Sequence, residues 1–172
     1  MTHNTSTPHD ITLRPAVLAD VPAIAAIEEA SFSHPGERFG LKRVRHLTIS
    51  PRPMVLVAES HVHSEIKVLG WIAALRWSRG RIPWGRIYAI AVDPTVRGKK
   101  LGQRLMHEMM AQLQEKGAAK IFLEVRADNH AALRLYEKLG FTVCQPLPNY
   151  YGHDIAGVRM VHVTASSPAA SP

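Results

Sequence analysis

Hydrophobic residues along the centre of the chain follow first the period of a strand and then the period of a helix. Residues 86–92 are rich in β-branched and aromatic side chains, with a short apolar run that Asp93-Pro94 ends, which predicts a buried strand. From residue 101 the apolar positions form one helical stripe that ends before Gly117, a residue suited to a left-handed helix end. The pattern therefore predicts a helix over residues 101–116, joined to the strand by a short loop.

A second strand and helix follow. Residues 121–126 alternate between two faces, one apolar with Ile121, Leu123 and Val125 and the other with Phe122, Glu124 and Arg126, which predicts a strand. Asp128 and Asn129 are good N-cap residues, and the apolar positions after them predict a helix that stops at Gly140.

The remaining segments complete a mixed sheet. Further strands are expected at residues 13–14, 54–59, 67–76, 141–145 and 158–163, and further helices after the N-cap Asp20 and over residues 41–48. The fold class is α/β (mixed α+β), with a central mixed sheet of six or seven strands flanked by about four helices, antiparallel strands first. With 172 residues and 46% hydrophobic content, we expect a single domain over residues 11–163 between flexible tails at 1–10 and 164–172.

The loop at residues 97–103 is basic and rich in glycine, as a phosphate site would be. Backbone N–H groups at a helix start lack acceptors and lie at the positive end of the helix dipole. The chain has no G-x-x-x-x-G-K-[ST], and Gly98 with Gly102 does not complete G-x-G-x-x-G, so neither a nucleotide hydrolase nor a dinucleotide enzyme is supported. The loop alone is equally compatible with a solvated, charged turn.

Glu124 places a carboxylate in the middle of the strand at 121–126. Alternation puts it on the same face as Phe122 and Arg126. Asn129 and Tyr136 are about two helical turns apart, so they project to nearly the same side of the next helix. A strand carboxylate, a polar cap and a phenol are therefore expected to line one cleft.

The order and spacing of these motifs resemble those of the GCN5-related N-acetyltransferases, the GNAT family. The resemblance rests on Ile90-Ala91-Val92-Asp93-Pro94, Arg97-Gly98-Lys99-Lys100-Leu101-Gly102, Leu123-Glu124-Val125-Arg126, Asn129 and Leu135-Tyr136-Glu137-Lys138-Leu139-Gly140-Phe141. It covers residues 11–163 and is nearest to the bacterial RimI type, which acetylates the N-terminal amine of a ribosomal protein. That type also carries a Tyr-Tyr pair where this chain has Tyr150-Tyr151.

The resemblance implies acetyl-CoA as the acetyl donor and direct transfer without a covalent acyl-enzyme. The backbone of residues 90–92 would run beside the pantetheine arm, with one N–H serving the thioester oxygen. The residues it implies for cofactor binding are Ile90, Ala91, Val92, Arg97, Gly98, Lys99, Lys100, Leu101, Gly102, Gln103 and Asn129.

Acetyl transfer to an amine requires a base, a donor to the oxyanion and an acid for the departing thiolate. A protein α-amine has a pKa near ~8, so a base of modest strength suffices, and Glu124 fits that role directly or through a water. Tyr136, a phenol with a reference pKa of about 10, is the expected acid. Two non-catalytic interpretations stay open. Tyr136 could be a core aromatic residue, and Glu124 could form a structural ion pair with Arg126. Asn129 is expected to serve as both N-cap and cofactor contact.

Lys100 departs from the family's phosphate-loop motif, [RQ]-x-x-G-x-[GA]. Lysine stands where the first glycine is expected. It keeps the backbone N–H that binds phosphate, but its Cβ resists positive φ. Either the loop uses a φ that lysine tolerates or its geometry is altered, and in both cases the ammonium adds positive charge near the diphosphate.

In the family the acceptor enters between the first helical region, here 32–45, and the last hairpin loop, here 146–157. Tyr150 and Tyr151 are weak candidates for peptide contacts and could equally be packing residues. Asp154 is the only acid in that loop, which does not favour a basic N-terminal peptide. The expected partner is a protein or peptide N-terminus, with a basic ribosomal protein as one candidate. A small amine such as an antibiotic, polyamine or amino acid would use the same catalytic groups, so it stays open as an alternative acceptor. The oligomeric state stays open as well.

The net charge of +7 suggests a hypothesis from a different class of protein, an RNA- or ribosome-binding module. The basic residues are scattered and form no known nucleic-acid motif, so nucleic acid is not required.

No apolar run approaches the ~18 residues that span a bilayer and no signal peptide is visible, so we expect no membrane partner and a cytoplasmic location. Cys144 is expected to be a buried, inert thiol. His61 and His63, in an expected hairpin connection, lack a third ligand, so no metal is expected.

Overall fold

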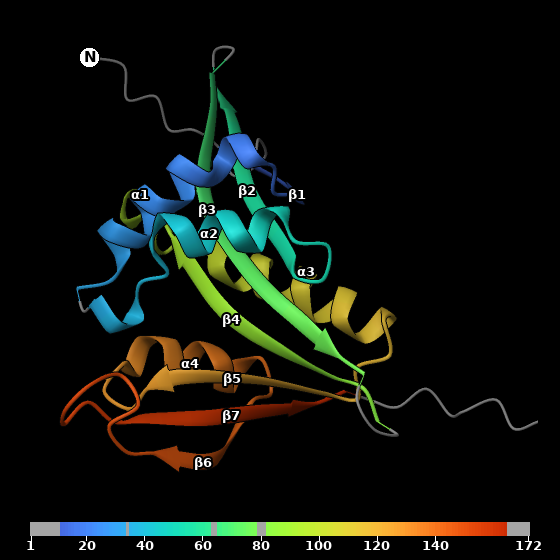
Figure 1. Ribbon diagram of the computed structural model, residues 1–172, viewed down its shortest axis with the longest axis vertical. Coiled ribbons are helices and arrows are strands. Elements are labelled where there is room, and N and C mark those ends of the chain that lie inside the picture. Colours follow the sequence, from blue (N-terminus) through green and yellow to red (C-terminus); the bar gives the residue numbers. More distant parts are fainter. Residues whose placement is uncertain (1–10, 34, 63–64, 79–81, 165–172) are drawn as a thin grey trace, which may run out of the picture. The chain divides into compact units, whose positions relative to one another are not determined.

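The computed structural model describes residues 11–33, 35–62, 65–78 and 82–164 (Figure 1). Seven strands hydrogen-bond in the order β1-β2-β3-β4-β5-β7-β6. The strands are β1 (Ile11–Pro15), β2 (Met54–Val62), β3 (Glu65–Trp77), β4 (Trp84–Val92), β5 (Lys120–Arg126), β6 (Thr142–Leu147) and β7 (Gly157–Val163). The α-helices in the described part of the chain are α1 (Val21–Ser31), α2 (Gly40–Ile49), α3 (Leu101–Glu115) and α4 (His130–Lys138). This mixed seven-stranded sheet with four helices confirms the predicted fold class.

The chain forms two compact units, and β3, β4 and α3 each contribute residues to both. The first unit comprises the described residues up to 73 together with 89–106, and the second comprises 74–88 together with 107–164. Thr164, assigned to a tail by the sequence pattern, is buried in the second unit and donates its hydroxyl to Ala118 O at 2.7 Å. The predicted tails at 1–10 and 165–172 otherwise lie outside the described residues.

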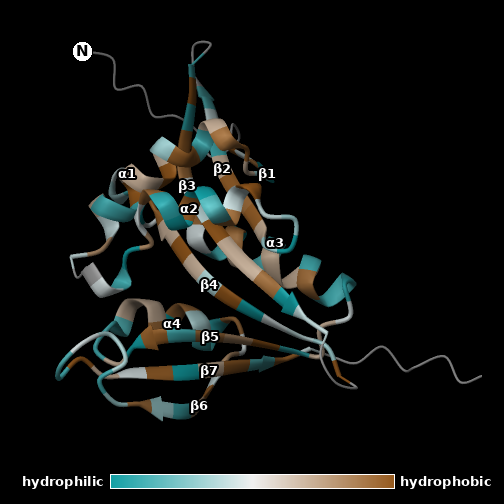
Figure 2. Ribbon diagram, in the orientation of Figure 1, coloured by the Kyte–Doolittle hydropathy of each residue, from teal (hydrophilic) through white to brown (hydrophobic). Residues whose placement is uncertain are grey.

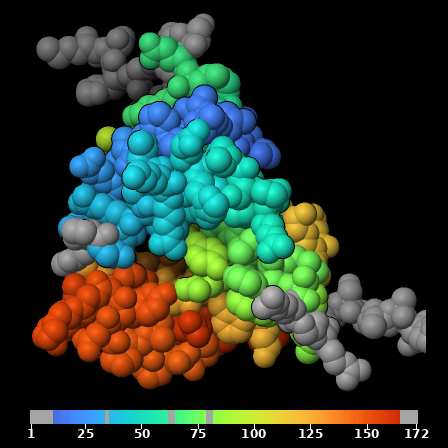
Figure 3. All heavy atoms as spheres, viewed as in Figure 1, coloured from blue at the N-terminus to red at the C-terminus, as the bar shows by residue number. Residues whose placement is uncertain are grey.

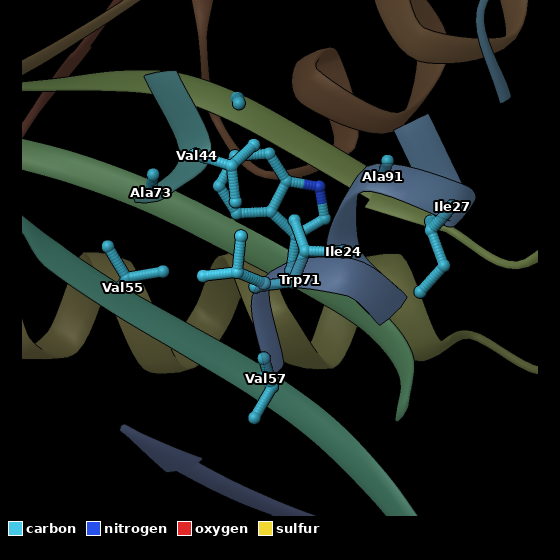
Figure 4. Close-up of a cluster of buried hydrophobic side chains, with 10 residues drawn as sticks. Ile24, Ile27, Val44, Val55, Val57, Trp71, Ala73 and Ala91 are labelled. Atoms are coloured by element: carbon cyan, nitrogen blue, oxygen red, sulfur yellow. The ribbon is translucent and has the colours of Figure 1, made fainter. Parts of the chain in front are cut away.

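The core of the first unit lies where α1 and α2 bring their apolar faces to the sheet residues. Pro22, in the first turn of α1, is compatible with a helix start because no intrahelical N–H is needed there. Ile24 and Val44 are fully buried, one from each helix, and both belong to the cluster that surrounds Trp71 (Figure 4). Trp71 is itself fully buried, so α1 and α2 are held by the hydrophobic contacts of one large side chain and its aliphatic neighbours.

In the second unit β5 is the central strand. It pairs in parallel with β4 from Trp84↔Lys120 to Ile87↔Leu123, and antiparallel with β7 along its whole length. Buried and half-buried residues alternate along β5, and Figure 2 shows hydrophilic bands between hydrophobic ones on β5 and β7. One face of the strand is therefore committed to the core, and the other carries Glu124.

Two local expectations from the sequence are wrong, namely a side-chain cap at Asp20 and a strand connection at His61. Asp20 does precede α1, but its carboxylate accepts from Val17 N–H at 2.8 Å and pairs with Arg14, and it makes no hydrogen bond to a helix amide. His61 lies inside β2 rather than in a connection, because that strand is longer than predicted, and its Nε2 lies 2.9 Å from Glu59 Oε1. His63 lies outside the described residues.

Cys144 is exposed rather than buried. The physical reason is its place on β6, the last strand in the sheet order, where five of six residues are exposed. An edge strand has a neighbour on one side only, so its side chains receive less cover. Figure 3 shows the segment of β6 and β7, orange to red, at the surface on the viewed face.

Over residues 11–33, 35–62, 65–78 and 82–164, no helix is long and apolar enough to cross a membrane. In the same ranges, no group of three or more His, Cys, Asp or Glu residues is arranged to hold a metal ion.

Candidate active site

The loop after β4 has a left-handed backbone at two positions. Gly98 has φ +81° and Lys100 has φ +59°. A lysine in this conformation carries a Cβ penalty of roughly 1–2 kcal/mol that a glycine would not. Lys100 therefore adopts a backbone conformation that favours glycine, and it adds an exposed cationic side chain there.

A short hydrogen-bonded turn leads into this loop. Asp93 Oδ1 accepts from the Thr95 N–H at 2.8 Å and from the Thr95 hydroxyl at 2.7 Å, and Lys67 Nζ lies 3.3 Å from Asp93 Oδ2. The hydrogen bond from the Thr95 side chain is the largest cause of the lowered pKa of Asp93, ahead of the contact with Lys67. The Asp93 carboxylate thus fixes the turn that sets the direction of residues 97–100.

The start of α3 has the features of an anion site. Its first i→i−4 hydrogen bond runs from Arg104 N–H to Lys100 O at 3.0 Å. The amides of Leu101 and Gly102 precede that bond and so have no acceptor within the helix itself. Arg97, Gly98, Lys99 and Lys100 are all exposed just before it. Basic side chains, a positive helix end and first-turn amides fit a diphosphate.

The last residues of β4 supply the remaining cofactor candidates. Ala91 points into the core of the first unit, while Ile90 and Val92 are half-buried. Ser31 Oγ donates to Val92 O at 3.2 Å, and Asp93 N–H donates to Leu69 O at 2.8 Å, so this strand end is held by α1 and β3. The parallel register with β5 ends at Ile87, five residues before β4 itself ends.

Glu124 is held between two arginines. Arg86 Nε donates to Glu124 Oε2 at 2.8 Å, and Arg159 Nε donates to Glu124 Oε1 at 2.8 Å. The Glu124 side chain is only 6% exposed, whereas those of Arg86 and Arg159 are 25% and 33% exposed. Glu124 is the next residue of β5 after the pairing with β4 ends, and it stands directly opposite Arg159 on β7. Both carboxylate oxygens are thus fixed by charge-assisted hydrogen bonds.

The network extends beyond this pair. Arg86 Nη2 donates to the Tyr150 hydroxyl at 2.9 Å, and Arg159 Nη1 donates to Gln145 Oε1 at 3.0 Å. The Arg86 guanidinium also lies over the Tyr88 ring, 4.7 Å from its centroid. Burial works to lower the pKa of Arg86, but the Glu124 carboxylate and neighbouring groups outweigh it, and the pKa is raised. Groups from β4, β5, β6 and β7 therefore meet around one carboxylate.

The alternative that pairs Glu124 with Arg126 is wrong in its partner. Arg126 Nε instead donates to Asp128 Oδ1 at 2.8 Å, two residues along the chain. On β7 the residue opposite Arg126 is Gly157, which has no side chain, while the residue opposite Glu124 is an arginine. A structural ion pair at Glu124 does exist, but its cations come from β4 and β7. Arg86 and Arg159 are the site residues that sequence reasoning missed, because the strand register that brings them together is not readable from local pattern.

Asn129 and Tyr136 lie on α4. Asn129 Oδ1 accepts from the Ala132 N–H at 3.1 Å, which confirms the predicted N-cap. Tyr136 is 7% exposed and packs edge-on against Phe141, with ring centroids 6.1 Å apart. Burial raises the pKa of Tyr136 to about 12, so its phenol keeps its proton throughout the neutral range.

Tyr150 and Tyr151 have different environments. Their rings meet edge to face with centroids 5.1 Å apart. Tyr150 is 45% exposed and reaches the Glu124 network through Arg86, whereas Tyr151 is half-buried and lies over Gly157. Tyr150 is thus available to a ligand near Glu124, and Tyr151 supports it.

The fold and these motifs together define a GNAT acetyltransferase. The model of the acetyltransferase (GNAT) family matches residues 21–141, and the chain therefore belongs to this family, whose members use acetyl-CoA. A [ribosomal protein bS18]-alanine N-acetyltransferase from Salmonella typhimurium is 31% identical over 152 residues, covering 84% of this chain and 93% of that protein.

Two further similarities involve Escherichia coli. Its [ribosomal protein bS18]-alanine N-acetyltransferase (strain K12) is 34% identical over 93 residues. That match spans 54% of this chain and 63% of the relative, just under two thirds of its length. The crystal structure of the ribosomal-protein-S18-alanine N-acetyltransferase from E. coli superposes with a TM-score of 0.80 at 23% identity, covering 94% of this chain and 99% of that one. The bacterial N-terminal acetyltransferases are thus the relatives that the RimI-type resemblance indicated.

Proposed function

We propose that this protein transfers the acetyl group of acetyl-CoA directly to the α-amine at the N-terminus of a protein or peptide. The observation that carries the proposal is Glu124, a strand carboxylate fixed on both oxygens and placed in the segment that matches the family. The Salmonella and E. coli relatives are [ribosomal protein bS18]-alanine N-acetyltransferases, which supports a protein amine as the acceptor. A ribosomal substrate would place the reaction in the cytoplasm.

Glu124 is the proposed general base. An amine that loses its proton to Glu124 must lie within hydrogen-bond distance of it or one water away. The arginines hold the carboxylate in one orientation, so the entropic cost of positioning it is met before the acceptor arrives. As the amine nitrogen forms its bond to the thioester carbonyl carbon, its proton passes to Glu124.

Tyr136 is the proposed general acid. When the tetrahedral intermediate collapses, the carbon–sulfur bond breaks and the sulfur needs a proton, which the phenol supplies. A pKa of about 12 keeps that proton in place until the thiolate develops. The N–H groups of residues 90–92 are the proposed donors to the oxyanion, and residues 97–103 with Asn129 are the proposed contacts of the coenzyme.

The test is a mass-spectrometric acetylation assay with three acceptor classes at equal concentration. The acceptors are peptides with a free N-terminus and no lysine, the same peptides blocked at the N-terminus but carrying one internal lysine, and small amines. Acetylation of the free α-amine alone is the expected result. Exclusive turnover of small amines or of lysine side chains would overturn the proposal.

The residue assignments are tested separately with Glu124→Gln and Tyr136→Phe. Each is expected to lower kcat/KM by at least about tenfold, the usual minimum for loss of a proton-transfer group. Glu137→Gln, an exposed neighbour on α4, is the matched control. Values within about threefold of the parent for both site variants would remove these roles.

A further inference from the structure

The groups around Glu124 carry an excess of positive charge. Arg86 and Arg159 supply two cations against the single carboxylate between them, and their nitrogen atoms lie 2.8 Å from its oxygens. Tyr150 and Gln145, the other hydrogen-bonding groups of the network, are neutral. Any ligand that reaches Glu124 therefore meets a local net charge of one positive unit.

The two guanidiniums still have donors to offer. A guanidinium carries five N–H bonds in a planar fork suited to a carboxylate. Arg159 uses Nε and Nη1 in its hydrogen bonds, and Arg86 uses Nε and Nη2. Both side chains are partly exposed, so the remaining N–H groups can reach a ligand.

The chemistry of the base determines where the acceptor must lie. If Glu124 removes a proton from the acceptor amine, the amine lies within hydrogen-bond distance or one water of it. The second residue of such an acceptor begins at a Cα about 3.8 Å from the first, so its side chain can extend to Arg86 or Arg159, whose guanidiniums contact Glu124. At such separations the two arginines repel a cation on the acceptor and attract an anion, and their partial burial weakens the screening by salt.

We infer that Arg86 and Arg159 make this protein selective for an acceptor with a carboxylate close to its amine, namely an N-terminus followed by an acidic residue. This inference rests on the proposed function and names its substrate class. An ammonium or guanidinium on the second residue would face the same two cations and be disfavoured. The acidic acceptor also suits the net charge of +7, which attracts anionic partners at long range.

The first experiment compares peptides that differ only in their second residue. Three peptides begin Ala-Asp, Ala-Asn and Ala-Lys and are otherwise identical, uncharged and free of lysine elsewhere. The expected order of kcat/KM is Asp above Asn above Lys, with about tenfold or more between Asp and Lys and most of the difference in KM. Raising the salt concentration to 0.5 M is expected to reduce the differences in kcat/KM among the three peptides. Equal values, or a preference for Lys, would overturn the inference while leaving N-terminal acetylation intact.

The second experiment changes the selecting residue. Arg159→Gln removes one cation and keeps a hydrogen-bond donor beside Glu124, and the measured quantity is the ratio of kcat/KM for Ala-Asp over Ala-Asn. That ratio is expected to fall by about fivefold or more, whatever happens to the absolute rate, because a general loss of Glu124 positioning would lower both peptides alike. An unchanged ratio would contradict a selecting role.

Lys120→Gln provides the matched control. Lys120 is exposed on the same strand, about 13 Å from Glu124 at ~3.3 Å per residue, which is beyond the screening length of about 8 Å at physiological salt. Its loss removes the same charge and is expected to leave the ratio unchanged.

Free aspartate and free alanine are tested as further acceptors, because an amino acid also bears a carboxylate near its amine. Turnover of these at the rate of the peptides would replace the peptide acceptor with an amino acid.

Discussion

The indole N–H of Trp71 donates to Glu28 Oε1 at 3.1 Å in the interior of the first unit. Glu28 Oε2 accepts from the Phe39 N–H at 2.9 Å, just before α2 begins, and the Glu28 residue is 2% exposed. Burial raises the pKa of Glu28 despite these hydrogen bonds. One buried carboxyl thus ties α1 to β3 and to the start of α2.

Glu28→Gln is expected to lower the free energy of unfolding by about 1–3 kcal/mol. The amide has one oxygen and one NH2 group, so it can accept from Trp71 or from Phe39 but must present donors to the other. Denaturant unfolding measures the loss. Glu29→Gln, the exposed neighbour on the same helix, is the control and is expected to change stability by less than about 0.5 kcal/mol.

The pH dependence of the Glu28 contribution has a definite sign. A pKa raised on folding means that the folded protein binds the proton more tightly than the unfolded chain. The resulting stabilisation is fully present below the unfolded pKa of about 4.3 and is lost as the pH rises through the higher folded value. The stability of the parent relative to Glu28→Gln is therefore expected to fall as the pH is raised from about 4. An increase over that range would contradict the burial argument.

Most of the fold could be predicted from the sequence because its signals are local. Alternation along 121–126 and the helical stripe from residue 101 correspond to β5 and α3 within one residue at each end. The N-cap at Asn129 depends on a side chain and an amide three residues away, so it too is local. The exposure of Cys144 depends instead on β6 being an edge strand, which is a property of the whole sheet.

The immediate surroundings of Glu124 could not be predicted for the same reason. The ion-pair alternative drawn from the sequence named Arg126, two residues away on the same face of the strand. The actual partners are 38 and 35 residues away and arrive through strand pairing. Arg159 stands opposite Glu124 in the pairing of β5 with β7, two strands that α4 and β6 separate along the chain, so this register has no local sequence signature.

Lys100 allows the loop strain and the loop charge to be measured separately. Lys100→Gly removes both the Cβ penalty and the ammonium, whereas Lys100→Ala removes only the ammonium. The glycine variant is expected to be more stable than the alanine variant by about 1 kcal/mol, because φ +59° costs alanine as it costs lysine. Thermal unfolding checks this difference, and equal stability would contradict the left-handed conformation.

The affinity for acetyl-CoA is the second readout for the Lys100 variants. Both are expected to bind about two- to fivefold more weakly than the parent, the usual effect of losing one exposed charge beside an anion. Titration calorimetry at low and high salt measures it, and the deficit is expected to shrink with salt. A gain of tenfold or more for Lys100→Gly would show that the lysine impairs the loop.

Tyr136 makes a prediction about the alkaline side of the rate profile. With a pKa of about 12, its phenol remains protonated well above neutral pH. The kcat is therefore expected to show no descending limb between about pH 8 and 10, where an unperturbed phenol would begin to ionise. Tyr136→Phe is expected to lower kcat across this range while changing the free energy of unfolding by less than about 1 kcal/mol, since the ring packing against Phe141 is kept. A falling kcat near pH 10 in the parent that is absent in Tyr136→Phe would assign the phenol an ordinary pKa.

Gly157 couples the last hairpin to the tyrosine pair. A Cβ at this position would lie 2.9 Å from Tyr151 Cε2 and 3.1 Å from Val125 O, and the backbone oxygen cannot move aside. Gly157→Ala is therefore expected to cost about 1–3 kcal/mol in stability and to displace the Tyr151 ring. Because Tyr151 packs against Tyr150, which accepts from Arg86, the KM for the acceptor peptide is expected to rise while that for acetyl-CoA stays unchanged. Ala156→Ser adds an atom at the adjacent exposed position and serves as the control. A Gly157→Ala variant with parental stability and parental acceptor KM would show that the hairpin accommodates the Cβ without moving Tyr151.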